Sequence, residues 1–232
     1  METVETSLAE TAGVAAEAKA YDRWFDEPWG GYAFAVEARA LLAAAGALAG
    51  QAALDVGCGT GRFTSLLAEA GARVTGLDLD AAMLGVATGR VPGRLVLGDA
   101  AHLPFPNGQF DLVAAVTLCE FTADVERVFA ELARVTRPGG RFIVGALNPA
   151  SAWGLAHRRR FRRPPWTRAR FLTRAALLRL GQRFGSAALS AHLYAPGAFP
   201  GLAAVGPALE AAGRVVPRLG AFQVLVVQRG HA

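Results

Sequence analysis

The sequence is poor in cysteine, in charge and in long apolar runs. Its two cysteines, Cys58 and Cys119, cannot build a disulfide framework, which favours a reducing compartment. Charged residues are only 19% of the chain and apolar residues 53%, so a disordered chain is excluded and a sizeable core is expected. Residues 1–19 lack the apolar core of a signal peptide, and the longest apolar stretch, residues 40–54, is mostly Ala and Gly. These absences predict a soluble, cytoplasmic protein.

Lysine is almost missing from the chain, and acidic residues are almost missing from its second half. One lysine stands against 23 arginines. Residues 1–131 hold 18 acidic and 8 basic side chains, whereas residues 132–232 hold 16 arginines and a single acid, Glu210. Ten of these arginines fall within residues 158–183, interleaved with aromatic residues. Such a segment could bind RNA phosphates, rest on an anionic membrane surface, recognise a carboxylated substrate, or form a solvated lid that pairs with the acidic first half.

Apolar runs and glycines divide the chain into alternating strands and helices. Residues 7–48 are predicted to be helical, with a break at Pro28, Gly30 and Gly31 and a second helix over Tyr32–Ala45. The predicted strands are residues 52–56, 73–78, 94–97, 110–116, 141–147, 187–194 and 222–228; the predicted helices between them are residues 62–70, 81–88, 123–136, 173–184 and 201–212, with a turn at 138–140 and a loop at 150–170. This alternation implies an α/β fold, doubly wound and Rossmann-like, in which a mostly parallel seven-stranded sheet has helices on both faces.

A glycine-rich turn, ALDVGCGTGR at residues 53–62, lies between the first strand and its helix. Its glycines let the backbone approach a ligand, and the helix N-terminus offers free N–H groups. Three acids, Asp55, Asp78 and Asp99, mark the ends of the first three strands. All three ends lie at the carboxyl edge of the sheet, where open α/β sheets bind ligands. There Asp78 could accept hydrogen bonds from ribose hydroxyls, and Asp99 from an adenine amino group.

Arg62 argues against the nearest alternative, a nicotinamide-dependent dehydrogenase. The dinucleotide fingerprint G-x-G-x-x-G needs its third glycine at position 62, which is arginine here. The loop is instead G-x-G-x-G with an acid just upstream. This pattern favours an adenosine that carries no pyrophosphate.

Residues 50–147 as a set resemble the class I S-adenosylmethionine-dependent methyltransferases. Besides the glycine-rich turn, Leu77–Asp80 with Met83 resembles the second motif of these enzymes, and residues 98–105, GDAAHLPF, resemble the third. Residues 132–140 resemble the helix and turn before the fifth strand. The pattern is most similar to small-molecule and quinone methyltransferases of the ubiquinone/menaquinone type. The resemblance implies S-adenosylmethionine as the cofactor.

The resemblance also implies a division of the chain and a set of cofactor contacts. Residues 1–48 would be an N-terminal helical and aromatic lid segment, residues 49–148 the S-adenosylmethionine-binding core, and residues 149–232 an Arg-rich substrate lid with C-terminal strands that complete the same sheet. Asp55 would hold the methionine ammonium group, Leu79 and Met83 would flank the adenine, and Thr117 would lie beside the sulfonium. The implied cofactor-binding residues are Tyr21, Asp55, Gly57, Cys58, Gly59, Asp78, Leu79, Met83, Asp99, Ala100 and Thr117.

The residues just after the fourth strand narrow the range of acceptors. Residues 117–120 read TLCE, whereas amino-methylating nucleic-acid enzymes of this fold resemble [ND]-P-P-[YF] there, so a DNA substrate is not expected. Cys119 follows Leu118 and not Pro, unlike the nucleophile of cytosine-C5 enzymes. The four histidines are scattered, and no metal site is predicted. Glu120 and His157 are the candidate catalytic residues, although proximity alone can drive methyl transfer to a nucleophilic atom.

These observations predict methyl transfer to a small organic acceptor, which could carry a carboxylate or a phosphate. The acceptor atom, O, N, S or C, is left open, as is the choice between a monomer and a homodimer. Two alternatives remain. One is an RNA methyltransferase that uses the Arg-rich segment, and the other is a non-catalytic protein that binds the cofactor.

Overall fold

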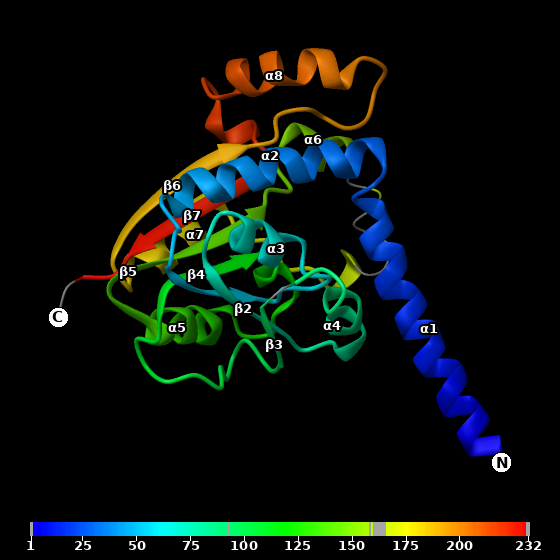
Figure 1. Cartoon of the computed structure of the whole chain (residues 1–232). Coiled ribbons are helices and arrows are strands. Elements are labelled where there is room, and N and C mark those ends of the chain that lie inside the picture. Colours follow the sequence, from blue (N-terminus) through cyan, green and yellow to red (C-terminus); the bar gives the residue numbers. More distant parts are fainter. Residues whose placement is uncertain (1, 92, 158, 160–165, 231–232) are drawn as a thin grey trace.

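The computed structural model describes residues 2–91, 93–157, 159 and 166–230 (Figure 1). Its strands form one seven-stranded sheet in the order β3-β2-β1-β4-β5-β7-β6. The bounds are β1 Ala52–Val56, β2 Arg73–Asp78, β3 Arg94–Leu97, β4 Phe110–Val116, β5 Thr136–Leu147, β6 Ser186–His192 and β7 Phe222–Gln228. Strands β1 to β5 run parallel, and β7 is antiparallel to both of its neighbours. The mostly parallel α/β sheet is therefore confirmed.

The strand order reverses between β1 and β4, which are hydrogen-bonded neighbours. From β1 the chain moves outward to β2 and β3, then returns to β4 on the other side of β1. Crossover connections leave in opposite directions at such a point, so a crevice opens at the carboxyl edge of the two strands. This edge holds the glycine-rich turn after β1 and residues 117–121 after β4.

Helices cover both faces of the sheet because the central strands are apolar on both sides. One core contains α2 (Pro28–Ala45), α3 (Arg62–Glu69) and alternate residues of the strands, such as Leu112 and Ile143. The other contains α5 (Val125–Val135), α7 (Arg174–Gln182) and the intervening residues, such as Val113 and Phe142. The remaining helices are α1 (Glu2–Trp24), α4 (Ala81–Ala87), α6 (Ala152–Ala156) and α8 (Leu202–Gly213), with the short 3-10 turns η1 (Cys119–Phe121), η3 (Trp166–Arg168) and η4 (Pro217–Leu219).

Pro28 begins a helix and does not break one, which corrects the prediction from the sequence. The chain turns at residues 25–27, and Pro28 occupies the first turn of α2, where its missing N–H costs no helical hydrogen bond. Gly30 and Gly31 lie inside this helix. A Cβ atom on Gly30 would lie 1.8 Å from the carbonyl oxygen of Trp24, so glycine is what lets α1 and α2 pack so closely at this corner.

Strand β5 starts five residues earlier than predicted, at Thr136. Residues 138–140 are a bulge within the strand and not a turn before it: Phe110 pairs with Thr136, but Leu112 pairs with Arg141. Gly139 has a φ of 69°, a left-handed conformation that suits glycine and lets the extra residues loop out of the ladder.

Helix α1 extends away from the body of the protein, and only its C-terminal part reaches the sheet's carboxyl edge, where it packs against α4 (Figure 1). Figure 1 also places α2 between the sheet and α8, in line with the close approach of Gly206 to the Tyr32 ring. Within the described residues, no helix combines the length and apolar character needed to cross a membrane.

Candidate cofactor and acceptor site

The glycine-rich turn adopts a conformation that only glycine takes easily. Gly57, Gly59 and Gly61 have φ angles of 71°, 54° and 80°. The N–H groups of Gly57 and Cys58 donate to the carbonyl oxygen of Leu77 at 2.7 and 2.9 Å, which ties the turn to the end of β2. The backbone of the turn is thereby held open and close to the neighbouring strand.

Asp78, at the end of β2, is hydrogen-bonded to the glycine-rich turn. Its Oδ2 accepts from the Gly59 N–H at 2.7 Å, and its Oδ1 accepts from the Asp80 N–H at 2.9 Å. Each carboxylate oxygen has two lone pairs, so both keep one for a ligand hydroxyl. Beside it, Leu79 is 71% exposed and Met83 is partly buried at the start of α4. An exposed apolar side chain next to a hydrogen-bonding carboxylate suits a ribose that carries a flat base.

Asp55 lies beneath the turn, and only 1% of it is exposed. Its Oδ2 accepts from the Thr64 hydroxyl of α3 at 2.6 Å. Burial raises the pKa of Asp55 to about 6, the hydrogen bond from Thr64 opposes this, and the charge of Asp78 adds to it. Asp55 therefore ties the end of β1 to helix α3 inside the protein.

Asp99 follows β3, and its side chain is 51% exposed. Its Oδ1 accepts from the Ala101 N–H at 2.9 Å, and its Oδ2 lies 3.2 Å from Nδ1 of His102. The Ala101 N–H and the His102 contact hold the pKa of Asp99 below its usual value. Ala100 is buried beside it. The acid is thus ionised and open on the same edge as Asp78.

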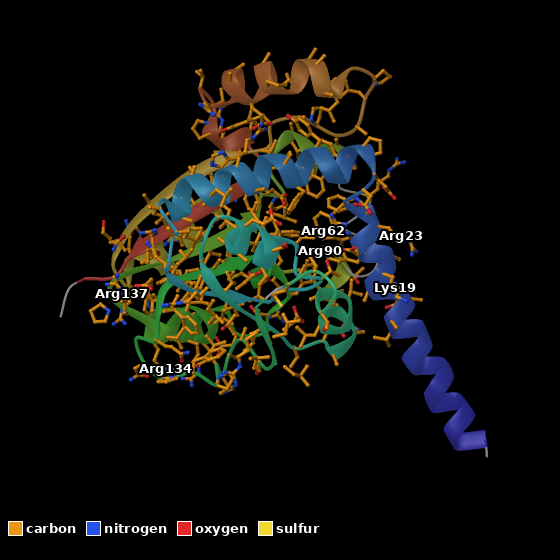
Figure 2. The ribbon with its side chains drawn as sticks, in the orientation of Figure 1. Lys19, Arg23, Arg62, Arg90, Arg134 and Arg137 are labelled. Carbon is orange, nitrogen blue, oxygen red and sulfur yellow. The ribbon has the colours of Figure 1, made fainter. Side chains whose placement is uncertain are left out.

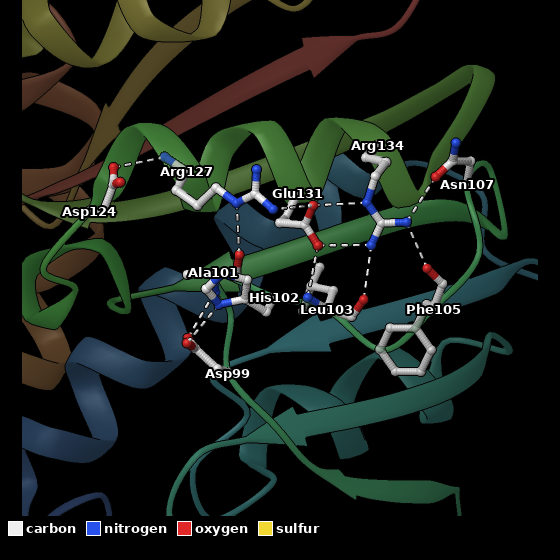
Figure 3. Close-up of polar contacts among 10 residues, drawn as sticks. All are labelled: Asp99, Ala101, His102, Leu103, Phe105, Asn107, Asp124, Arg127, Glu131 and Arg134. Atoms are coloured by element: carbon white, nitrogen blue, oxygen red, sulfur yellow. Dashed lines mark hydrogen bonds and ion pairs between the residues drawn. The ribbon is translucent and has the colours of Figure 1, made fainter.

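Helix α5 holds the loop that carries Asp99, as Figure 3 shows. Glu131 is 4% exposed, and its Oε2 accepts from the Leu103 N–H at 2.8 Å. Arg134 forms two 2.8 Å hydrogen bonds to Glu131 and donates to the carbonyl oxygens of Leu103 at 2.9 Å and Phe105 at 2.7 Å. One ion pair therefore fixes residues 103–105, the LPF segment of the motif.

A charged clasp ties α1 to the glycine-rich turn. Asp22 accepts from Thr60 Oγ1 at 2.7 Å, from Arg62 Nε at 2.9 Å and from both terminal nitrogens of Arg90 at 2.9 Å. Burial alone would raise the pKa of Asp22, but the hydrogen bonds from Arg90, Arg62 and Thr60 hold it well below its usual range. Figure 2 shows Arg62 and Arg90 between α1 and the body of the protein. The clasp holds the end of α1 over the turn.

Tyr21, the residue before the clasp, lies over Gly59. A Cβ atom on Gly59 would lie 4.0 Å from Cε1 of Tyr21. Burial, helped by the carboxylates of Glu37 and Asp78, raises the pKa of Tyr21 to about 12. The residue as a whole is still 44% exposed, so part of it remains open to solvent over the turn.

The segment after β4 packs against the same turn. A Cβ atom on Gly57 would lie 2.7 Å from Cδ1 of Leu118. Thr117 has a φ of 52°, which is strained for a β-branched residue, and its N–H donates to the carbonyl oxygen of Gly145 at 2.8 Å. Backbone strain of this kind persists only where the surrounding structure holds it in place, and it is found mainly at functional sites.

Glu120 is buried three residues further on, 2% exposed, in η1. Its Oε1 accepts from the Leu147 N–H at 2.5 Å, whereas its Oε2 is buried and has no hydrogen-bond partner among the described residues. Burial raises the pKa of Glu120 to about 7, against the hydrogen bond from Leu147. A proton can therefore leave or join this carboxyl group near neutral pH.

The other candidates come from the second half of the chain. His157 stacks on Trp153, with ring centroids 5.4 Å apart, and its Nδ1 lies 3.0 Å from the Trp153 carbonyl oxygen. Of the Arg-rich segment, residues 158 and 160–165 lie outside the described residues, so the predicted role of the cluster stays a prediction. In the described part of the chain, no group of three or more His, Cys, Asp or Glu side chains is arranged to hold a metal ion.

Two acids of the site are not recognisable from the sequence. Asp22 lies in an aromatic stretch with no motif around it, and Glu37 lies in an Ala- and Leu-rich helix like any surface glutamate. Glu37 is 7% exposed on α2, and burial and the charge of Glu120 raise its pKa to about 8. The spacing of Glu37 within α2 gives no sign of its burial, which depends on how α2 packs across the sheet.

Comparisons with known proteins agree with this geometry. The fold is that of class I methyltransferases: the structure described as a possible histamine N-methyltransferase from Thermotoga maritima superimposes with a TM-score of 0.71 at 23% identity, covering 93% of this chain and 97% of that one. Residues 54–144 match the family described as "Methyltransferase domain". These residues are therefore a class I methyltransferase domain, the kind whose cofactor is S-adenosylmethionine.

Curated relatives match a part of this chain of similar length. The malonyl-[acyl-carrier protein] O-methyltransferase of Serratia marcescens is 40% identical over 103 residues, 44% of this chain and 40% of that protein. The demethylmenaquinone methyltransferase of Tropheryma whipplei is 38% identical over 112 residues, 46% of each protein. The chain thus spans less than half the length of these relatives.

Proposed function

We propose that the protein transfers a methyl group from S-adenosylmethionine to a small organic acceptor. The arrangement at the carboxyl edge of β1, β2 and β4 carries this proposal: a left-handed glycine turn, Asp78 with free lone pairs beside exposed Leu79, and the strained Thr117 all meet there. The cofactor, when bound, supplies an electrophilic methyl group on a sulfonium.

In this proposal each side chain binds or orients one part of the cofactor. Asp78 accepts from the ribose hydroxyls, and Leu79 and Met83 flank the adenine. Asp99 accepts from the adenine amino group, and the N–H of Ala100 faces a ring nitrogen. The remaining groups act on the methionine half. Asp55 helps to hold the ammonium group, directly or through water, and the backbone of Gly57, Cys58 and Gly59 packs against the methionine part. Tyr21 covers it, and Thr117 lies beside the sulfonium.

The acceptor side favours a small molecule. Phe121 is 45% exposed, its ring centroid lies 5.8 Å from that of Trp166, and Trp166 stacks on Phe171 at 6.4 Å. These rings come from both halves of the chain and form an aromatic group beside Glu120, suited to an organic molecule. We also infer a cytoplasmic location, because both cysteines are buried and unpaired.

Calorimetry with S-adenosylmethionine, S-adenosylhomocysteine and NAD tests the proposal. We expect both adenosyl sulfur compounds to bind and NAD not to bind. Asp78→Asn should weaken binding roughly 10- to 100-fold, because the amide loses a charged acceptor for the hydroxyls. Asp124→Asn, which changes an exposed helix-capping acid of α5, is the matched control and should bind normally. NAD binding without S-adenosylhomocysteine binding would overturn the proposal.

A further inference from the structure

Two buried carboxyl groups, Glu37 on α2 and Glu120 on η1, remain unexplained by cofactor binding. They are 7% and 2% exposed. Helix α2 and η1 both pack on β5, and the two acids are near enough for the charge of Glu120 to act on Glu37. Buried acids are rare unless they are paired with a cation or fully hydrogen-bonded.

Neither carboxyl group has an arginine, lysine or histidine partner among the described residues. Glu120 Oε2 has no hydrogen-bond partner there, and its Oε1 has only the Leu147 N–H. No hydrogen bond or ion pair from the described residues reaches the Glu37 side chain, whereas the clasp around Asp22 shows that this chain can surround an acid with arginines. The two acids also repel each other, because the charge of Glu120 raises the pKa of Glu37.

Glu37 has a neighbour at the cofactor turn, and Glu120 has one beside the aromatic group. On one side, Glu37 is close enough to Tyr21 for its charge to act on the hydroxyl, and Tyr21 covers Gly59. On the other, the carbonyl oxygen of Glu120 accepts from the Arg170 N–H at 2.7 Å, which joins η1 to the chain that carries Trp166 and Phe171. A ligand beside Thr117 would meet the carboxyl groups at one end and aromatic rings at the other.

We propose that Glu37 and Glu120 are the acceptor-binding residues of the site and that the acceptor is an amine, which they bind as its ammonium ion. The proposal rests on the proposed methyltransferase function and names its substrate class. An ammonium group has three donors and a positive charge, which supply the partner that Glu120 Oε2 lacks among the described residues and relieve the repulsion between the two acids. A carboxylate or phosphate at this position would add a third negative charge.

Glu120 also accepts the proton that the ammonium group must lose before methyl transfer. The bound ammonium gives one proton to the Glu120 carboxylate, which leaves a neutral amine with a free electron pair. This pair forms the new nitrogen–carbon bond to the methyl group, while the carbon–sulfur bond breaks and its electrons stay on sulfur. The products are a methylated ammonium ion and the neutral thioether, and Glu120 releases its proton to water.

The experiment uses the full-length protein and primary amines of increasing size: methylamine, phenethylamine and tryptamine. Each amine is paired with the carboxylate that replaces its ammonium group. Binding is measured by calorimetry and thermal shift with S-adenosylhomocysteine present, and turnover as S-adenosylhomocysteine formed from S-adenosylmethionine. We expect at least one amine to bind and to be methylated, and its carboxylate partner to do neither.

Glu120→Gln and Glu37→Gln should weaken amine binding at least about tenfold and leave S-adenosylhomocysteine affinity unchanged. Glutamine at 120 still offers an oxygen to the Leu147 N–H, and Glu37 has no hydrogen bond from the described residues to lose, so both variants should fold. Thermal unfolding confirms the folding. The control is Glu69→Gln, an acid at the far end of α3 whose side chain accepts from Ser65.

Several outcomes would overturn the inference. One is binding or methylation of the carboxylates in place of the amines, and another is equal amine binding by the wild type and both variants. A third is no response to any amine at about 10 mM, enough to reveal millimolar Kd values; the two acids would then be a pair that shares a proton between them. Failure of S-adenosylhomocysteine to bind would instead refute the proposed function, so the two failures are separable.

Discussion

At the scale of single residues, Asp22 contributes most to closing the site, and it does so through charge. It accepts hydrogen bonds from Thr60, Arg62 and Arg90, all donors from the body of the protein. The Asp22 side chain is 16% exposed, and those of Arg62 and Arg90 are 17% and 28% exposed, so water screens these contacts less than ordinary surface ion pairs. Asp26, four residues on, binds the same Arg62 but is 67% exposed.

Asp22→Asn should therefore lower both the free energy of unfolding and cofactor affinity, each by about 1–3 kcal/mol, because two arginines lose a charged acceptor. Denaturant unfolding and calorimetry with S-adenosylhomocysteine measure the two quantities. Asp26→Asn is the control and should change stability by less than about 0.5 kcal/mol, as expected for an exposed pair. Equal effects of the two variants would show that the clasp has no special role.

Some residues of the site are predictable from the sequence, and others are not. Asp78, Asp99 and the glycines are predictable from the sequence because their roles depend on local spacing: a strand, a turn and a helix within a few residues. Asp22 and Glu37 are not, because the residues that surround them are distant in sequence; Asp22 and Arg90, for example, are 68 residues apart. Contacts that depend on where α1 and α2 pack produce no periodic pattern in the sequence.

At the scale of elements, α5 acts as a support for the loop that carries Asp99. The Glu131–Arg134 pair on this helix takes up the Leu103 N–H and the carbonyl oxygens of Leu103 and Phe105 (Figure 3). The loop has no regular structure, so these hydrogen bonds replace those that a strand or helix would give it. The position of Asp99, the proposed adenine contact, therefore depends on hydrogen bonds from a neighbouring helix.

Arg134→Met should destabilise the protein by about 2–4 kcal/mol, because nearly buried Glu131 loses its cation and two carbonyl oxygens lose their donor. Denaturant unfolding measures this loss, and hydrogen exchange should rise over residues 99–107. Arg127→Met is the control: Arg127 is half exposed, lies 3.9 Å from Glu131 and donates to Ala101 alone among the loop carbonyls. Unchanged exchange in the Arg134 variant would contradict the supporting role of α5.

Most of the helices and strands are predictable from the sequence. Each of the seven strands lies within a few residues of its predicted place, because an apolar run flanked by glycine has few other structures open to it. The two corrections, Pro28 and residues 138–140, concern residues that are compatible with two structures. Proline suits a helix's first turn as well as its end, and a Pro-Gly-Gly run suits a bulge as well as a turn. Only the packing of neighbouring elements selects between them.

At the scale of the whole molecule, two groups of acids have opposite effects on the free energy of unfolding as pH changes. Asp22, Asp111 and Glu131 have a pKa below its usual value because arginines bind them, so their contribution to stability is present at neutral pH and is lost in acid. Glu37, Glu120 and Asp55 have pKa values raised to about 8, 7 and 6, mainly by burial. Their contribution is greatest in acid, below the pKa of the unfolded chain, and is lost as pH rises through these values.

The free energy of unfolding should therefore peak at about pH 5 and fall between pH 5 and pH 8, because unfolding releases the protons that the buried acids keep when folded. Glu37→Gln removes the highest of the raised pKa values, so it should flatten this fall and stabilise the protein at pH 8 by at least about 1.4 kcal/mol, the worth of one pKa unit. Thermal unfolding from pH 4 to pH 9 measures how stability depends on pH in the wild type and in the variant, with Glu69→Gln as the control.

A gain in stability from Glu37→Gln, together with the loss of the proposed amine binding, would mean that the fold keeps an unfavourable pair of acids because they bind the ligand. A loss of stability at pH 8 would mean that Glu37 supports the structure, and the acceptor would then have to be bound elsewhere.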